Sequence, residues 1–302
     1  MTKTNDNFIM LPTVDFCFKE LMNNEKVRRG FIAALLRKDP EKIRRTTLLP
    51  TELRREYADD KLGILDVRVL LENGAQIDME MQVAYFENWD ARAVFYLSKI
   101  FSDQLKKGEP YESLQQCIHV SILNFIHFKD DDRCCRRISF CDEETGKKYT
   151  DLMQIQILEL KKLTAKAEHE ETIISWMRFL SGKSREEFEA MARSDEYMEE
   201  AYDALKKLSA DDRAKLEYEA REKAIRDYNS QMSSALRRGR KQGQLLSQIE
   251  LIQKKCQKGK TLEQIADEME EEASEIEKLY QVVSQNPEKT AEQLLQMAGQ
   301  DM

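Results

Sequence analysis

Two short runs of alternating apolar and polar residues, 64–71 and 77–83, constrain the fold more than any other feature of the sequence. A period of two is typical of strands that bury one face. Asn73-Gly74 lies between the runs and is a strong signal for a hairpin turn. We therefore predict two antiparallel strands joined by a short loop.

The length of that loop decides which side chains share a face of the hairpin. A two-residue turn would set the apolar residues of one strand opposite the polar residues of the other. A three-residue loop over 73–75, with one residue in a left-handed conformation, restores the match. In the register that this loop gives, Glu72 lies opposite Gln76 and Asp66 lies opposite Gln82.

This register gathers oxygen-bearing side chains on the polar face of the hairpin. Asp66, Glu80 and Gln82 come within reach of one ion. Two carboxylates with a polar neighbour suit a hard divalent cation such as Mg²⁺, which takes oxygen ligands and keeps several waters. Such an ion can activate a water and neutralise charge on a phosphodiester. A hairpin whose polar face is simply solvated is the alternative that the pattern alone leaves open.

The sequence on either side of the hairpin predicts a mixed α/β domain. Apolar residues recur with helical spacing over 14–36 and again beyond residue 88. Residues 41–62 are polar and mixed, so we expect a loop with a short helix there. Further strands are predicted at 119–128, 139–140 and 150–160.

The remainder of the chain is helical and polar, and only five Pro and ten Gly occur in 302 residues, which indicates few turns. We predict an α/β domain at 1–163, a highly charged helical connector at 164–243, and a small helical module with a tail at 244–302. The tail after Asn286-Pro287 is expected to be weakly ordered.

Two capping boxes predict helix starts in the C-terminal module. They are Thr261-x-x-Gln264 and Ser274-x-x-Glu277. The helix that follows the second box is acidic, whereas a helix that reads DNA should be neutral or basic. Packing or self-association is therefore the favoured role of this module, and we expect a homo-oligomer formed through the C-terminal helices as one outcome.

Charge is distributed unevenly along the chain. The net charge of −8 disfavours a nucleic-acid-binding protein, because affinity for DNA comes largely from Lys and Arg on phosphates. Residues 237–260, however, hold eight basic residues and one acid, and residues 263–277 hold eight acids and no base. The global balance thus leaves room for local DNA contact.

Compartment and cysteine chemistry follow from what the sequence lacks. No run of 18 apolar residues occurs, and the N-terminus has no signal-peptide pattern, so we predict no membrane partner and a cytoplasmic protein. The cysteines form no CxxC pair and only three His are present, which disfavours a zinc site. For the cluster Cys134, Cys135 and Cys141, free thiols are favoured over a disulfide or a metal role.

Several segments resemble one family. Asp66, thirteen intervening residues and then Glu80-Met81-Gln82 resemble the PD-(D/E)XK nuclease motif. More narrowly, residues 10–160 resemble the PD-(D/E)XK nuclease family transposases, also called recombination-promoting nucleases. The segments that carry this narrower resemblance are Asp15-Phe-Cys-Phe-Lys19-Glu-Leu21, the hairpin, Arg92-x3-Tyr96-x-Ser98 and Gly108-x2-Tyr111.

The resemblance implies a fold, a cofactor and roles for individual residues. The implied fold is α/β, with a restriction-endonuclease-like core of mixed sheet flanked by helices, followed by a mainly helical C-terminal region. Asp66 and Glu80 would be ligands of Mg²⁺, or of Mn²⁺ as its substitute, and Gln82 stands where the general motif has lysine. Glu20 is a candidate third carboxylate. Candidates for positioning the substrate are Lys19, Arg68, Arg92 and Tyr96.

Three functions of different classes follow from these observations, and the third is a helical scaffold that binds a partner through residues 165–302. The first is a Mg²⁺-dependent DNA endonuclease that hydrolyses phosphodiesters with a metal-activated water, in transposition, recombination or defence against mobile DNA. The second is a DNA-binding or assembly protein that keeps the nuclease fold with weak or no catalysis. The acidic balance and the missing lysine favour the second, and the carboxylate pattern favours the first.

Overall fold

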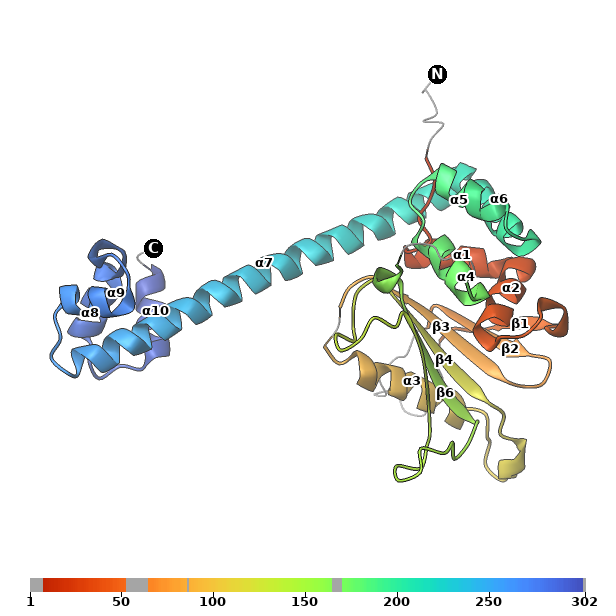
Figure 1. Ribbon diagram of the computed structural model, residues 1–302, viewed down its shortest axis with the longest axis horizontal. Coiled ribbons are helices and arrows are strands. Elements are labelled where there is room, and N and C mark those ends of the chain that lie inside the picture. Colours follow the sequence, from red (N-terminus) through yellow and green to blue (C-terminus); the bar gives the residue numbers. More distant parts are fainter. Residues whose placement is uncertain (1–7, 53–64, 86, 165–169, 301–302) are drawn as a thin grey trace, which may run out of the picture. The chain divides into compact units, whose positions relative to one another are not determined.

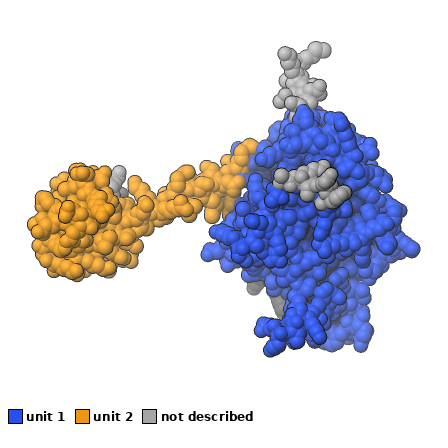
Figure 2. Space-filling view, in the orientation of Figure 1, with its two compact units in different colours: residues 1–225 blue, residues 226–302 orange. Residues whose placement is uncertain are grey.

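The computed structural model describes residues 8–52, 65–85, 87–164 and 170–300. The chain folds into two compact units, residues 1–225 and 226–302 (Figure 2). The division differs from the expected boundary at residue 163. The helices after that residue contribute side chains to the core of the first unit, and the aromatic rings of Phe31 and Trp176, for example, lie 5.6 Å apart.

The first unit is built on a six-stranded sheet with the strand order β1-β2-β3-β4-β6-β5 (Figure 1). β3, β4 and β6 run parallel to one another, and the other neighbouring pairs are antiparallel. The strands are β1 (Thr46–Leu49), β2 (Val67–Leu71), β3 (Gln76–Gln82), β4 (Cys117–Leu123), β5 (Cys135–Ser139) and β6 (Met153–Glu159).

Helices cover both faces of this sheet. α3 (Trp89–Ser102) packs on one face against β4 and β6. The opposite face carries the main core, which the remaining helices of the unit complete (Figure 1). These helices are α1 (Asp15–Asn23), α2 (Glu25–Leu36), α4 (Thr172–Ser181), α5 (Arg185–Ala192) and α6 (Glu196–Ala210). Single turns of 3-10 helix lie at η1 (Pro40–Lys42), η2 (Tyr111–Ser113) and η3 (Leu160–Lys162).

The hairpin of β2 and β3 has the three-residue loop that strand parity predicts, but the loop begins one residue earlier than expected. The backbone N–H of Leu71 donates to the carbonyl of Ala75, so the loop is 72–74. Gly74 ends it with a φ of 83°. Glycine is favoured at this left-handed position because it has no Cβ. In a three-residue hairpin loop, the left-handed residue is the last one.

The shifted loop changes the register by two residues. Arg68 pairs with Asp78 and Leu70 with Gln76, so the expected pairs of Glu72 with Gln76 and of Asp66 with Gln82 are wrong. A shift by two keeps every side chain on its predicted face, because successive side chains alternate. The even-numbered residues of both strands face α3, and the odd-numbered apolar residues face the main core.

Two other expectations for the first unit are corrected. The predicted helix over 14–36 is divided into α1 and α2 at Asn24, whose side chain accepts hydrogen bonds from the N–H groups of Lys26 and Val27 and so starts a new helix. Residues 41–62, expected as a loop with a short helix, contain η1 and also β1. The part at 53–62 lies outside the described residues. β1 was missed because its four residues show no clear alternation.

The C-terminal unit begins within one long helix, α7 (Asp212–Cys256). The first part of this helix belongs to the first unit, where Tyr218 is buried in the core. The core of the C-terminal unit joins the end of α7 to α8 (Leu262–Met269), α9 (Ala273–Gln285) and α10 (Ala291–Gln300). The predicted capping box of Thr261 and Gln264 is present. The one at Ser274 is wrong, because α9 starts at Ala273.

The tail after Pro287 is a helix and packs on its own unit. Ala291, Leu294 and Ala298 of α10 are buried in the C-terminal core, so the expected weak order of this tail is wrong. The apolar spacing of three and four residues is that of a helix with one buried face. None of the helices in the described ranges is long and apolar enough to cross a membrane.

Candidate active site

Glu80 lies in the middle of the sheet, on the face that α3 covers. Its side chain is closed off, with 2% of the residue exposed. One carboxylate oxygen, Oε1, lies 3.5 Å from a guanidinium nitrogen of Arg92. The other, Oε2, is buried and has no hydrogen-bond partner among the described residues. A buried carboxylate oxygen without a partner is costly, so Glu80 lies where a further ligand would stabilise it.

Asp66 comes immediately before β2, and its side chain reaches across to β3. Its Oδ2 accepts a hydrogen bond of 2.8 Å from the backbone N–H of Met81. Continuing the observed register one pair beyond Val67 and Met79 sets Asp66 opposite Glu80. The corrected register therefore brings the two carboxylates directly across the hairpin from each other, closer than the expected pairing did.

The electrostatics of the two carboxylates agree with this proximity. Burial raises the pKa of Glu80 to about 7, with Asp78 and Asp66 adding to the rise, while His119 and Arg92 oppose it. Burial also raises the pKa of Asp66 to about 6, while the hydrogen bond from Met81 opposes the rise. Negative charges close together in a low-dielectric site repel, which disfavours the charged form of each. A nearby cation would favour the charged form of both.

Arg92 is the one base that the described residues place against Glu80. It extends from the first turn of α3, and its guanidinium lies 5.5 Å from the ring centroid of Trp89 and 5.1 Å from that of Tyr96. These two rings hold the charge in place by cation–π contact. Arg92 and Tyr96, two of the candidates for positioning the substrate, thus contact each other beside Glu80.

Gln82 and Arg68 have other partners. Gln82 Nε2 donates to the carbonyl of Ala84 at 3.1 Å. Arg68 donates to the side-chain oxygen of Gln76 at 2.8 Å, further from Glu80 along the hairpin. The structure therefore assigns the positive charge at the carboxylates to Arg92 rather than to Arg68.

The first helix contributes an acid that the sequence reasoning did not select. Asp15, at the start of α1, acts on Asp66 and raises the pKa of that carboxyl. Asp15 also forms an ion pair with Arg221 of α7. Glu20 is half-buried five residues further along α1, and Lys19 is exposed. Asp15 is the first residue of the Asp15–Leu21 segment that resembles the family. This position is the sequence feature that could have identified Asp15 as a site residue.

A second polar pair lies behind Glu80 on the same face of the sheet. Asp78 and His119 are adjacent across β3 and β4, fully buried, and joined at 2.5 Å through His119 Nδ1. Burial alone would lower the pKa of His119, but the ion pair with Asp78 outweighs burial and raises it. His119 is therefore a core histidine whose Nδ1 is satisfied by Asp78. Ser121, the strand partner of Glu80, is buried as well.

Asp66 and Glu80 fit one hard cation. Carboxylate oxygens are the ligands that Mg²⁺ prefers, and one or two carboxylates suffice because the ion keeps several waters. The buried, unpartnered Oε2 of Glu80 and the raised pKa values of both groups are what a dication would relieve. No cluster of three or more His, Cys, Asp or Glu side chains within the described ranges could hold a metal. The fit thus rests on these two carboxylates.

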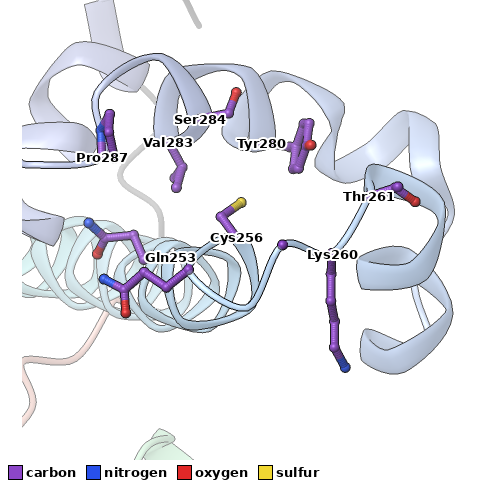
Figure 3. Close-up of a pocket in the computed structure, with 10 residues that line it drawn as sticks. Gln253, Cys256, Lys260, Thr261, Tyr280, Val283, Ser284 and Pro287 are labelled. Atoms are coloured by element: carbon purple, nitrogen blue, oxygen red, sulfur yellow. The ribbon is translucent and has the colours of Figure 1, made fainter.

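Two further features of the described residues are a pocket in the C-terminal unit and the free cysteines. The C-terminal unit has a pocket of about 380 Å³, whose lining includes Cys256, Lys260 and Tyr280 and no carboxylate (Figure 3). All six cysteines are free. Burial raises the pKa of the Cys135 and Cys256 thiols, so they are poor nucleophiles and poor metal ligands.

A mixed sheet flanked by helices, with two acids facing each other on adjacent strands, is the architecture of the restriction-endonuclease-like class of nucleases. The family model of the PD-(D/E)XK nuclease family transposases matches residues 12–235 of the chain. The chain belongs to this family, whose members are nucleases related to transposition and generally use divalent metals. Neither the curated proteins nor the solved structures contain a match.

Proposed function

We propose that the chain is a DNA endonuclease that hydrolyses phosphodiester bonds with Mg²⁺ held by Asp66 and Glu80. The observation that carries the proposal is the pair of carboxylates across the β2–β3 hairpin, with one buried oxygen of Glu80 left unpartnered among the described residues. Membership of a nuclease family makes DNA the substrate class that we infer. Mn²⁺, with similar oxygen chemistry, is expected to substitute.

Each side chain has a distinct role in this proposal. Asp66 and Glu80 would hold the metal, which would supply Lewis-acid chemistry and could lower the pKa of a water. The N–H of Met81 orients Asp66, and Arg92 keeps the second oxygen of Glu80 in place. Arg92 also supplies positive charge near the scissile phosphate, where the general motif has lysine and this chain has Gln82.

A plasmid-nicking assay tests the proposal. Supercoiled plasmid is incubated with the full chain in Mg²⁺, in Mn²⁺ and in EDTA, and relaxed circles are quantified over time. We expect nicking with either metal and none in EDTA. Asp66→Asn and Glu80→Gln, which keep shape and remove charge, should each reduce the rate by at least about 10²-fold. Nicking by the Asp66→Asn variant at the wild-type rate would overturn the assignment of that residue.

A second function, DNA binding or assembly without cleavage, is supported by a specific observation. Gln82, at the position of the motif's lysine, donates to a backbone carbonyl, and Glu80 is engaged by Arg92. Isothermal calorimetry with Mn²⁺ separates the two functions. Metal binding that depends on Glu80, together with no nicking in either metal, would favour the second function over the first.

A further inference from the structure

The central part of α7 combines full exposure with an unusual charge pattern. Between Asp227 and Glu250 the helix contains no acidic residue and four basic ones. The basic residues are Arg237, Arg238, Arg240 and Lys241, and all four are exposed. We call these four residues the basic cluster. Its charge contrasts with the net charge of −8 of the whole chain.

Several charged residues in the flanking parts of the chain form ion pairs, and those of the basic cluster form none among the described residues. Earlier in α7, Arg213 lies near Glu217, and Arg221 pairs with Asp15. After it, Lys255 and Lys260 both pair with Glu268. Among the described residues, no carboxylate lies within ion-pair distance of any member of the basic cluster.

The charge pattern of the basic cluster destabilises α7 when no partner is bound. Arg237 lies three and four residues from Arg240 and Lys241, so like charges meet on the helix surface, where such pairs are destabilising. Gly239 and Gly243 lower the helix propensity of the same stretch. A surface that only had to stay soluble would alternate acids with bases, as the first turns of α7 do. An anionic partner would remove the repulsion.

We infer that the basic cluster of α7 binds the phosphate backbone of duplex DNA outside the active site. Arg237 and Lys241 lie roughly 6 Å apart along the helix, at a rise of about 1.5 Å per residue, which matches contacts to neighbouring phosphates. The flanking neutral residues Ser233, Ser234 and Gln242 are of the types that also donate to phosphate oxygens. The choice of DNA as the anion rests on the proposed function.

An apolar stripe on the same helix presents a different surface. Tyr228, Met232 and Leu236 recur every four residues and are 43%, 50% and 59% exposed. By helical geometry Arg237 and Lys241 point away from this stripe, since they lie about 100° and about 140° around the axis from Leu236, whereas Arg240 continues the line of the stripe. Self-association through the stripe therefore leaves Arg237 and Lys241 free to bind DNA, and sedimentation measures self-association separately from DNA binding.

The salt dependence of DNA binding tests the inference in the full chain. Binding of a fluorescent duplex is followed by anisotropy in EDTA, where no cleavage interferes, at KCl from about 50 to about 200 mM. The variant replaces the four residues of the basic cluster with Gln, which keeps helix propensity. We expect the slope of log K against log salt to become shallower by about 3.6, since each of the four phosphate contacts contributes about 0.9, and affinity to fall at least about tenfold.

A matched control removes the same charge elsewhere. Lys206, Lys207, Arg213 and Lys223 are exposed or half-exposed on α6 and the first turns of α7, and their change to Gln gives an equal net charge. This control should keep the wild-type slope. Circular dichroism shows whether both variants keep their helix content, and a variant that lost it would be replaced by Arg237→Gln with Lys241→Gln, for which the slope should fall by about 2.

The outcomes separate this inference from the proposed nuclease function. Equal slopes for the wild type and the cluster variant, or equal losses in variant and control, would overturn the inference even if Mg²⁺-dependent nicking is found. A shallower slope of log K against log salt for the cluster variant, in a chain that does not nick DNA, would support the inference and contradict the proposed nuclease function. A cluster variant that changes the sedimentation coefficient and leaves DNA affinity intact would overturn the inference and reassign the surface to self-association.

Discussion

A carboxylate such as that of Glu80 is unusual in a sheet interior, because burying a negative charge is costly unless it is compensated. Here the compensation is partial. One oxygen meets Arg92 and the other meets no donor among the described residues. The residue is therefore kept at the expense of stability, and such local conflicts are typical of functional sites. Its protonation then couples the stability of the fold to pH.

Replacing Glu80 with Gln should make the metal-free protein more stable at high pH. The pKa of Glu80 is about 7 in the folded chain and about 4.3 when unfolded, so the folded state binds more protons between these values. Stability from this group is therefore lost as pH rises through that window. We compare the unfolding free energy of Glu80→Gln with that of the wild type at each pH. The difference in favour of the variant should be larger at pH 8 than at pH 5, by on the order of 2 kcal/mol.

Urea unfolding of both proteins in EDTA at the two pH values measures this difference. Mg²⁺ should stabilise the wild type at pH 8 and leave Glu80→Gln unchanged, because only the wild type binds the ion in its folded state. A difference between the two proteins that does not vary with pH would contradict the raised pKa.

Arg92 should act as a positioning residue for Glu80. The effect of a substitution at this position on nicking should therefore depend more on the charge of the side chain than on its shape. Arg92→Gln should lower kcat for nicking by about 10²-fold, and Arg92→Lys should recover part of the loss. A control on the same helix is Lys99→Gln, since Lys99 lies near the end of α3, about two turns from Arg92, and should keep the wild-type rate. A purely structural Arg92 would instead lower the unfolding midpoint in proportion to activity, with no rescue by Lys.

At the scale of elements, strand parity could be predicted and strand register could not. Alternation fixes which side chains face α3, and that part was confirmed for Asp78 and Glu80. Register depends on where the loop begins. The alternating pattern did not decide which loop residue is left-handed, and in the structure this residue is Gly74. The partnership of Glu80 with Arg92 was also beyond the sequence, because it depends on how α3 packs on the sheet.

Gly30 shows why a helix-breaking residue stands inside α2. A Cβ at this position would lie 2.7 Å from Cβ of Tyr197 and 2.9 Å from the Trp176 ring, so the close packing of α2 on α4 and α6 requires glycine. Gly30→Ala should therefore destabilise the first unit by about 1–3 kcal/mol through overpacking.

The same change at Gly243 is the matched control. Gly243 lies on exposed α7 with nothing within 4 Å of an added Cβ, and Ala there should be neutral or stabilise the helix by about 0.5–1 kcal/mol. Thermal unfolding followed by far-ultraviolet circular dichroism compares the two variants. A Gly30→Ala protein that is as stable as the wild type would show that Tyr197 and Trp176 can move aside at no cost.

For the whole molecule, the sequence could locate the composition change but not the boundary between compact units. The connector predicted at 164–243 is highly charged, yet Trp176, Phe188 and Met198 within it are buried in the core of the first unit. Few apolar residues are enough to attach a helix when they lie on one face. The exposed part is therefore shorter, from about residue 226 to the start of the C-terminal core at Leu245.

This shorter exposed stretch should be the preferred site of trypsin cleavage among the described residues. Its backbone is held by helical hydrogen bonds, with few buried side chains, so it opens locally at low cost. Arg237, Arg238, Arg240 and Lys241 provide the cleavage sites there. We expect early fragments that end near Lys241 and begin near Gln242, identified by mass spectrometry.

Duplex DNA should slow this cleavage if the basic cluster binds phosphate, since bound Arg and Lys side chains are not available to the trypsin specificity pocket. Glu-C protease is the control, because its sites lie outside the acid-free stretch and its rate should not respond to DNA. Early trypsin cuts at Lys206 and Lys207 instead would contradict the attachment of α6 to the first unit. Equal trypsin rates with and without DNA would contradict DNA binding by the basic cluster. They would still agree with an exposed helix in this stretch.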